Sequence, residues 1–178
     1  MNYNIFIWEI VTFVLICIIS SVIYIYLEYQ DSNKFYKLFI PKNDSIWERI
    51  KVLLAPTLLI MLVEALMIEV SPNFMFAKLL SIVTMSLANP LIFIILFNFS
   101  KWDMVVINVL TTIVSAIIGL LVSIMILNIP LLPDPIIFIS MAGIIVIFVF
   151  YLFATFYQTD DFIFLDPVTK RITLKKDN

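Results

Sequence analysis

Five long apolar runs, separated by short polar segments, fill most of the 178-residue sequence. Each run is long enough to cross the hydrocarbon core of a bilayer, which takes a helix of about 20 residues. Because lipid offers the backbone no hydrogen-bond partner, each crossing segment is expected to be helical. A membrane β-barrel would instead need alternating segments of about 10 residues, which the pattern lacks. The predicted spans are 5–29, 46–70, 74–99, 104–127 and 136–157.

Composition supports this fold class. Hydrophobic residues make up 63% of the chain and the mean hydropathy is +1.11, whereas a soluble domain is closer to half apolar. The polar stretches are too short to build a separate core. The sequence therefore predicts an all-α, polytopic membrane bundle over residues 1–157 and a cytoplasmic tail over residues 158–178. Its expected location is the cell membrane, as a multi-pass protein surrounded by the lipid bilayer.

The positions of the cations predict the orientation. Of the 11 Lys and Arg residues, all except Lys78 fall in the first loop and the helix start after it, in the third loop, or in the tail. Five crossings place those three regions on one side. Because loops rich in Lys and Arg stay in the cytoplasm, we expect the N-terminus outside and the C-terminus inside.

Several classes of function are disfavoured by composition. The chain has no His and a single Cys, Cys17, which removes the commonest metal ligand and general base and any intramolecular disulfide. The net charge of −2 gives no basic field for nucleic acid. No catalytic motif is recognisable. The sequence therefore predicts no catalytic residue, cofactor, metal site or nucleic-acid partner.

Glu64 is the most informative polar residue, because it lies inside the second apolar run. An ionisable group within a membrane-spanning helix should face the bundle interior. It is interpreted either as a proton or cation site or substrate anchor, or as a neutral acid bonded to a neighbouring helix. Asn89 and Pro90 complete the candidate intramembrane site, since Pro90 frees a backbone carbonyl that Asn89 could bond. Glu69 and Lys78 flank the short turn between the second and third spans, and both are interpreted as structural residues that reach the outer interface or form an ion pair.

The start of the second span carries a second signal. Ser45 and Glu48 have the spacing of a capping box, and Trp47 is placed where an interfacial anchor belongs. With the end of the first helix and the tail nearby, the chain offers a candidate cytoplasmic-face cluster of Glu28, Glu48, Arg49 and Asp166.

The same segment carries a resemblance. The pattern Asn43-x-Ser45-x-Trp47-Glu48 at the start of helix two, with Asp166-Pro-x-Thr169 after the last helix, resembles an uncharacterised family of small bacterial multi-helix membrane proteins, a domain of unknown function. The resemblance implies a membrane location and no known activity. The chain departs from that pattern where Arg49 replaces His, Asp44 replaces a Glu-like residue, and Lys170 replaces Gly.

Two functional classes remain open, and a third is weaker. The first is a small transporter, or a transporter subunit, that uses Glu64. The second is a non-catalytic assembly or accessory subunit that binds a membrane-protein partner or a second copy of the chain. Its contact would be a small-residue ridge, Ser115, Gly119 and Ser123, although packing inside the bundle is the favoured interpretation of that ridge. The third is a membrane enzyme built on the cytoplasmic-face cluster, which matches no recognised catalytic set.

Overall fold

The computed structural model describes residues 3–26, 34–67, 72–157 and 161–166. These residues form an all-α protein with six α-helices and one short 3-10 helix. The elements are α1 (Tyr3–Tyr26), α2 (Lys34–Phe39), α3 (Ile46–Met67), α4 (Phe74–Phe99), α5 (Met104–Asn128), α6 (Asp134–Phe156) and η1 (Phe162–Phe164). Five of them, all except α2 and η1, are long and apolar enough to cross a membrane.

The long helices follow the predicted spans closely. The predicted starts at Ile46, Phe74 and Met104 are confirmed, and the predicted ends at residues 29 and 70 lie outside the described residues. Helix α2 is an addition, since no helix was predicted between the first two spans. Tertiary contacts fix it: Lys51 Nζ donates hydrogen bonds to the carbonyls of Lys37 and Ile40, each at 3.0 Å.

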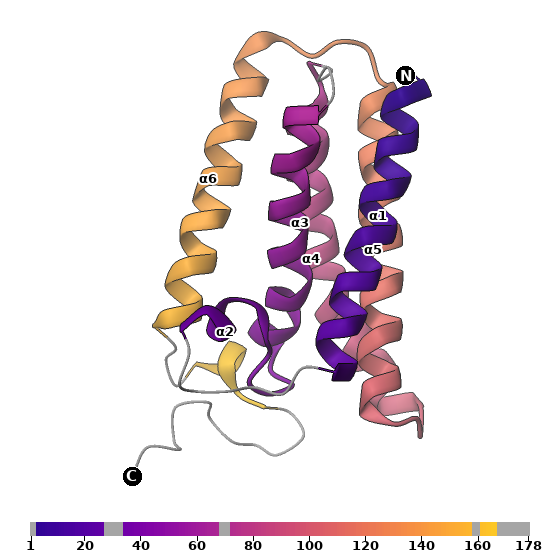
Figure 1. The fold of residues 1–178 in the computed structure, drawn as a ribbon, viewed down its shortest axis with the longest axis vertical. Coiled ribbons are helices and arrows are strands. Elements are labelled where there is room, and N and C mark those ends of the chain that lie inside the picture. Colours follow the sequence, from indigo (N-terminus) through magenta and orange to yellow (C-terminus); the bar gives the residue numbers. More distant parts are fainter. Residues whose placement is uncertain (1–2, 27–33, 68–71, 158–160, 167–178) are drawn as a thin grey trace.

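Each long helix runs antiparallel to the long helix that follows it in the chain (Figure 1). As a result, the starts of α1, α4 and α6 and the ends of α3 and α5 lie together at what we call the Tyr3 end, at the top of the figure. The opposite end is called the Tyr26 end. Helices α4 and α5 form the most extensive pair, and α1 packs on both α3 and α5. Helix α6 contacts α4, and contacts α2 and α3 less extensively.

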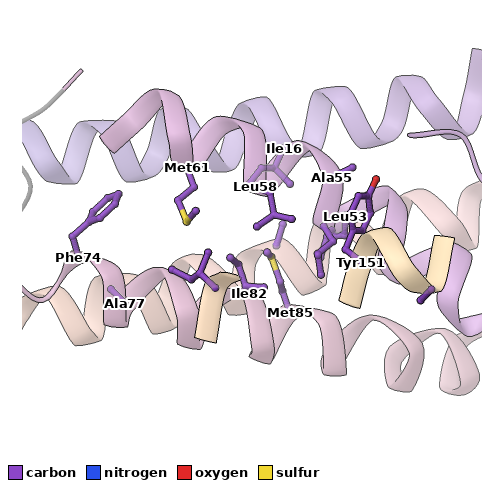
Figure 2. Packing of buried hydrophobic residues seen from close by; sticks show 14 of the residues in the cluster. Ile16, Leu53, Ala55, Leu58, Met61, Phe74, Ala77, Ile82, Met85 and Tyr151 are labelled. Atoms are coloured by element: carbon purple, nitrogen blue, oxygen red, sulfur yellow. The ribbon is translucent and has the colours of Figure 1, made fainter. Parts of the chain in front are cut away.

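The interior and exterior are both apolar along most of their length. Figure 2 shows Leu53 and Leu58 of α3 packed against Ile82 and Met85 of α4, with Ile16 of α1 beside them. The outer face of the bundle also consists of large apolar side chains, of which Phe138 of α6, 71% exposed, is one example. Exposing such a side chain to water costs about 1.5–3 kcal/mol. This exterior therefore suits a lipid environment.

The small-residue ridge of α5 packs inside the bundle. Ser115, Gly119 and Ser123 are all buried. A Cβ atom at Gly119 would lie 2.9 Å from Ser81 Oγ and 3.3 Å from Met85 Cβ, both on α4. The absence of a side chain at Gly119 is what lets α4 and α5 approach closely.

Trp47 departs from its predicted role as an interfacial anchor. It is only 3% exposed, because its ring packs edge-on against Phe150 at a centroid distance of 5.6 Å and against Phe164 at 6.5 Å. Phe164 belongs to η1, so the chain after α6 folds back onto the start of α3. The rest of the tail, residues 167–178, lies outside the described residues.

Candidate functional site

A buried ionic triad joins three helices near the Tyr3 end. Lys78 Nζ of α4 lies 2.6 Å from Glu9 Oε1 of α1 and 2.7 Å from Glu64 Oε2 of α3. Both distances are typical of charge-assisted hydrogen bonds. Glu9, Glu64 and Lys78 are 3%, 0% and 4% exposed, respectively, so bulk solvent reaches none of them.

The antiparallel order of the helices brings these residues to one level. Glu9 is six residues after the start of α1, Lys78 is four residues after the start of α4, and Glu64 is three residues before the end of α3. At a rise of about 1.5 Å per residue, each lies within about 10 Å of its helix end. The site is therefore closer to the Tyr3 end than to the middle of the bundle.

The two oxygens of Glu64 have different surroundings. Oε2 accepts a hydrogen bond from Thr12 Oγ1 at 3.2 Å in addition to its contact with Lys78. Oε1 is buried and has no hydrogen-bond partner among the described residues. A cavity of about 20 Å³ adjoins the triad, and its polar lining includes Thr12, Thr57 and Ser81. That volume accommodates about one water molecule.

The charges of the triad do not balance. With all three groups ionised, two carboxylates share one ammonium and the site carries a net charge of −1. A buried charge that lacks a partner costs several kcal/mol in an apolar interior. Uptake of one proton by either carboxylate makes the site neutral. The arrangement therefore has the chemistry of a site that binds and releases a single proton.

Sequence reasoning identified Glu64 but missed its partners. Glu9 was not singled out, and Lys78 was expected to reach the outer interface or to pair near the outer turn rather than to bind Glu64 inside the bundle. The signal that could have found them is charge within apolar runs: Glu9, Glu64 and Lys78 each interrupt a hydrophobic helix, and the cation has the opposite sign to the two acids. Glu69, which could also have been a partner of Lys78, lies outside the described residues.

A second buried ionic cluster lies near the Tyr26 end, around Arg49 of α3. Its guanidinium donates to Asn108 Oδ1 at 2.6 Å and to Asp44 Oδ1 at 3.1 Å, and it also donates to the Asp44 carbonyl. Asn108 donates in turn to Asp44 at 2.9 Å. The guanidinium carbon is 3.1 Å from the centre of the Phe93 ring, a cation–π contact. This cluster has the bonds expected of a structural lock.

Glu48 also forms contacts at the Tyr26 end of the bundle, but with partners other than those of Arg49. The Ser45 hydroxyl accepts the Glu48 backbone N–H at 3.4 Å, which confirms that half of the capping box. The reciprocal bond is replaced, because the Ser45 N–H donates to Asn43 Oδ1. The Glu48 carboxylate instead accepts the Lys42 N–H at 3.0 Å and forms an ion pair with Lys51. It therefore fixes the connection between α2 and α3.

The predicted cytoplasmic-face cluster is only partly assembled. Asp166 is buried and acts electrostatically on Arg49, so these two residues are brought together. The Glu48 carboxylate, by contrast, is bonded to Lys42 and Lys51. Glu28 lies outside the described residues.

The structure separates Asn89 and Pro90 from Glu64. Asn89 lies 11 residues beyond Lys78 on α4, about 16 Å further along the helix axis. Neither its amide nitrogen nor its amide oxygen bonds any described residue, so the expected bond to the carbonyl freed by Pro90 is not formed.

Comparison with known proteins adds no family or fold relative: no protein-family model, no curated protein and no solved structure matches this chain. The resemblance to the small bacterial membrane proteins stays a prediction from the sequence. Any functional conclusion therefore depends on the chemistry of the buried groups.

Proposed function

We propose that the chain is a multi-pass protein of the cell membrane that works as a small transporter or transporter subunit, using the triad of Glu9, Glu64 and Lys78 to bind and release a proton. The observation that carries the proposal is the unequal pairing of the triad: two buried carboxylates share one ammonium, and Glu64 Oε1 has no partner among the described residues. Ionisable groups inside a membrane are costly, and they commonly mark proton and ion pathways.

The distribution of Lys and Arg supports an orientation for this function. With the N-terminus outside, the triad lies near the outer surface and the Arg49 cluster near the cytoplasm. The small cavity lined by Glu9 and Lys78 then provides space for a proton-carrying water molecule at the outer part of the pathway.

Infrared difference spectroscopy tests the proton site directly. We expect the wild-type protein in lipid to show a carboxyl group that gains its C=O stretch with falling pH between about pH 9 and pH 4, and Glu64→Gln to lose or shift that band. Asp103→Asn is the matched control, because it neutralises an exposed acid. A wild-type spectrum in which no buried carboxyl titrates over this range would contradict the proposal.

Transport is then tested in proteoliposomes that enclose a pH-sensitive dye. With an imposed pH gradient, the wild-type protein and Asp103→Asn are expected to move protons, and Glu64→Gln is expected not to. Equal proton flux with Glu64→Gln would remove Glu64 from the mechanism.

The alternative is a non-catalytic assembly or accessory subunit. It is favoured by the weak attachment of α6, whose flank forms an apolar groove of about 560 Å³ with α3 and α4. In that case the triad is a fixed ion pair, and no carboxyl titrates. Co-purification in mild detergent with a second membrane protein, together with an infrared spectrum that does not change with pH, would support this class.

A further inference from the structure

The Lys78 ammonium occupies the place in the triad where a bound monovalent cation would bridge the two acids. It is 2.6 Å from an oxygen of Glu9 and 2.7 Å from an oxygen of Glu64. No other described cation forms an ion pair with either acid. The positive charge in this site is thus part of the chain and cannot be exchanged with the solution.

The Phe74 ring lies 5.1 Å from the Lys78 ammonium, and the other polar groups near the site are hydroxyls, which are oxygen ligands of the kind that hard cations prefer. The Thr12 hydroxyl bonds Glu64, and Thr57 and Ser81 line the adjoining cavity. Helix α5 contributes only the apolar residues Ala116 and Leu120 to this lining. Among the described residues, the charged groups facing Lys78 are therefore Glu9 from α1 and Glu64 from α3.

Space and charge together decide which ion this site accepts. A sodium ion added beside Lys78 would place two cations within a few ångströms of each other, and in an apolar interior that repulsion is strong. The cavity of about 20 Å³ is also too small for an ion that keeps any of its water shell. A proton needs no cavity, because it forms an O–H bond on a carboxylate oxygen that is already present.

We propose that Lys78 sets the ion selectivity of the triad: its tethered ammonium occupies the cation position between Glu9 and Glu64, so that the site takes up a proton and excludes Na⁺. That the ion taken up is a proton rests on the proposed function, but the exclusion of Na⁺ by Lys78 is tested separately. Removal of the ammonium should leave two carboxylates, the nearby hydroxyls and a vacated space, which together form a site for Na⁺.

Thermal unfolding in detergent tests the assignment, with NaCl compared against choline chloride at equal ionic strength. We expect Lys78→Ala to gain about 5 °C in Tm from Na⁺ well above its Kd. The wild-type protein should show no difference between the two salts. Lys78→Met is the matched control, because it removes the charge but fills the space, and it should not respond to Na⁺. Adding Glu9→Gln to Lys78→Ala should abolish the response.

The assignment can still be tested if the Lys78→Ala variant folds poorly. In that event we expect purification in NaCl to recover folded protein and purification in choline chloride to fail. Recovery in neither salt, an equal Tm in both salts, or stabilisation of the wild-type protein by Na⁺ would each overturn the assignment.

The two proposals fail in different measurements. A wild-type protein with no titrating carboxyl, combined with a Na⁺ response in Lys78→Ala, would contradict the proton function and support the selectivity role of Lys78. A titrating wild-type carboxyl with no Na⁺ response in Lys78→Ala would contradict the selectivity role alone.

Discussion

Replacement of Arg49 by Met is expected to destabilise the Tyr26 end of the bundle more than any change at an exposed cation. Arg49 is 1% exposed and holds three groups together: Asp44 in the loop before α3, Asn108 of α5, and the Phe93 ring of α4. Methionine keeps part of the side-chain volume but cannot donate a hydrogen bond. The effect therefore measures the polar contacts rather than a cavity.

The size of the effect follows from these contacts. Breaking a buried ion pair by removing one partner costs about 3–5 kcal/mol. The Asp44 side chain is 29% exposed, so water takes over part of its solvation and the lower end of the range, about 3 kcal/mol, applies. For a chain of this length, 1 kcal/mol corresponds to about 2–4 °C in Tm, which gives an expected loss of about 6–12 °C.

Unfolding monitored by circular dichroism in detergent micelles provides the measurement. Lys101→Met is the control, since Lys101 is an exposed cation and its replacement should change stability by no more than about 0.5 kcal/mol. A double-mutant cycle with Asn108→Ala should give a coupling of at least about 1 kcal/mol between the two positions. A loss at Arg49→Met no larger than the control, or the absence of coupling, would refute the view that this cluster locks the bundle.

Two further changes probe the packing of α4 and α5. Asn73→Ala removes an amide that donates to the Ile126 carbonyl at the end of α5 and to two carbonyls of the α5–α6 connection, and that accepts the Leu132 N–H of that connection. We expect a loss of about 2 kcal/mol and faster proteolysis in the α5–α6 connection, and unchanged proteolysis would count against this role of Asn73. Gly119→Ala forces a Cβ to within 2.9 Å of Ser81 Oγ, so it should cost about 1–2 kcal/mol. Ser81→Gly should restore most of that loss, and equal losses in both backgrounds would contradict the close contact.

The long helices could be predicted because the signal is local. A run of apolar residues that must pair its own backbone in lipid has only one regular structure available, so composition alone places the spans. Helix α2 has no such signal. It depends on Lys51, 14 residues beyond Lys37 in the chain, and on the Tyr151 hydroxyl, which bonds the Leu38 carbonyl from α6. Neither contact is visible before the helices are packed.

The candidate site was predictable only in part for a related reason. Glu64 is conspicuous within its own helix, but the identity of its partners depends on which helices are neighbours. Glu9 and Lys78 are separated by 69 positions, and nothing in either local segment indicates the other. Asn89 shows the converse error: its position beside Pro90 suggested a local bond, but in the packed bundle its amide is buried without a hydrogen-bond partner among the described residues.

Buried charges also explain why these particular helices are neighbours. Lipid tails are as apolar as leucine, so the hydrophobic effect does not select one helix pairing over another inside a membrane. The triad binds α1, α3 and α4 at the Tyr3 end, and the Arg49 cluster binds α3 to α5 and α4 at the Tyr26 end. None of the ion pairs described in these two clusters includes a residue of α6, and α6 is the least buried of the five long helices.

The triad and the Arg49 cluster differ in how completely their polar atoms are hydrogen-bonded. Around Arg49, the guanidinium, the Asn108 amide and Asp44 are bonded to one another, so a proton entering or leaving would break an existing bond. In the triad, Glu64 keeps one buried oxygen without a partner among the described residues, and the two acids outnumber the single ammonium. An ion pair selected only to hold helices together would gain stability from completing its bonds. The incomplete pairing at Glu64 is therefore the reason that we propose proton exchange at the Tyr3 end and not at Arg49.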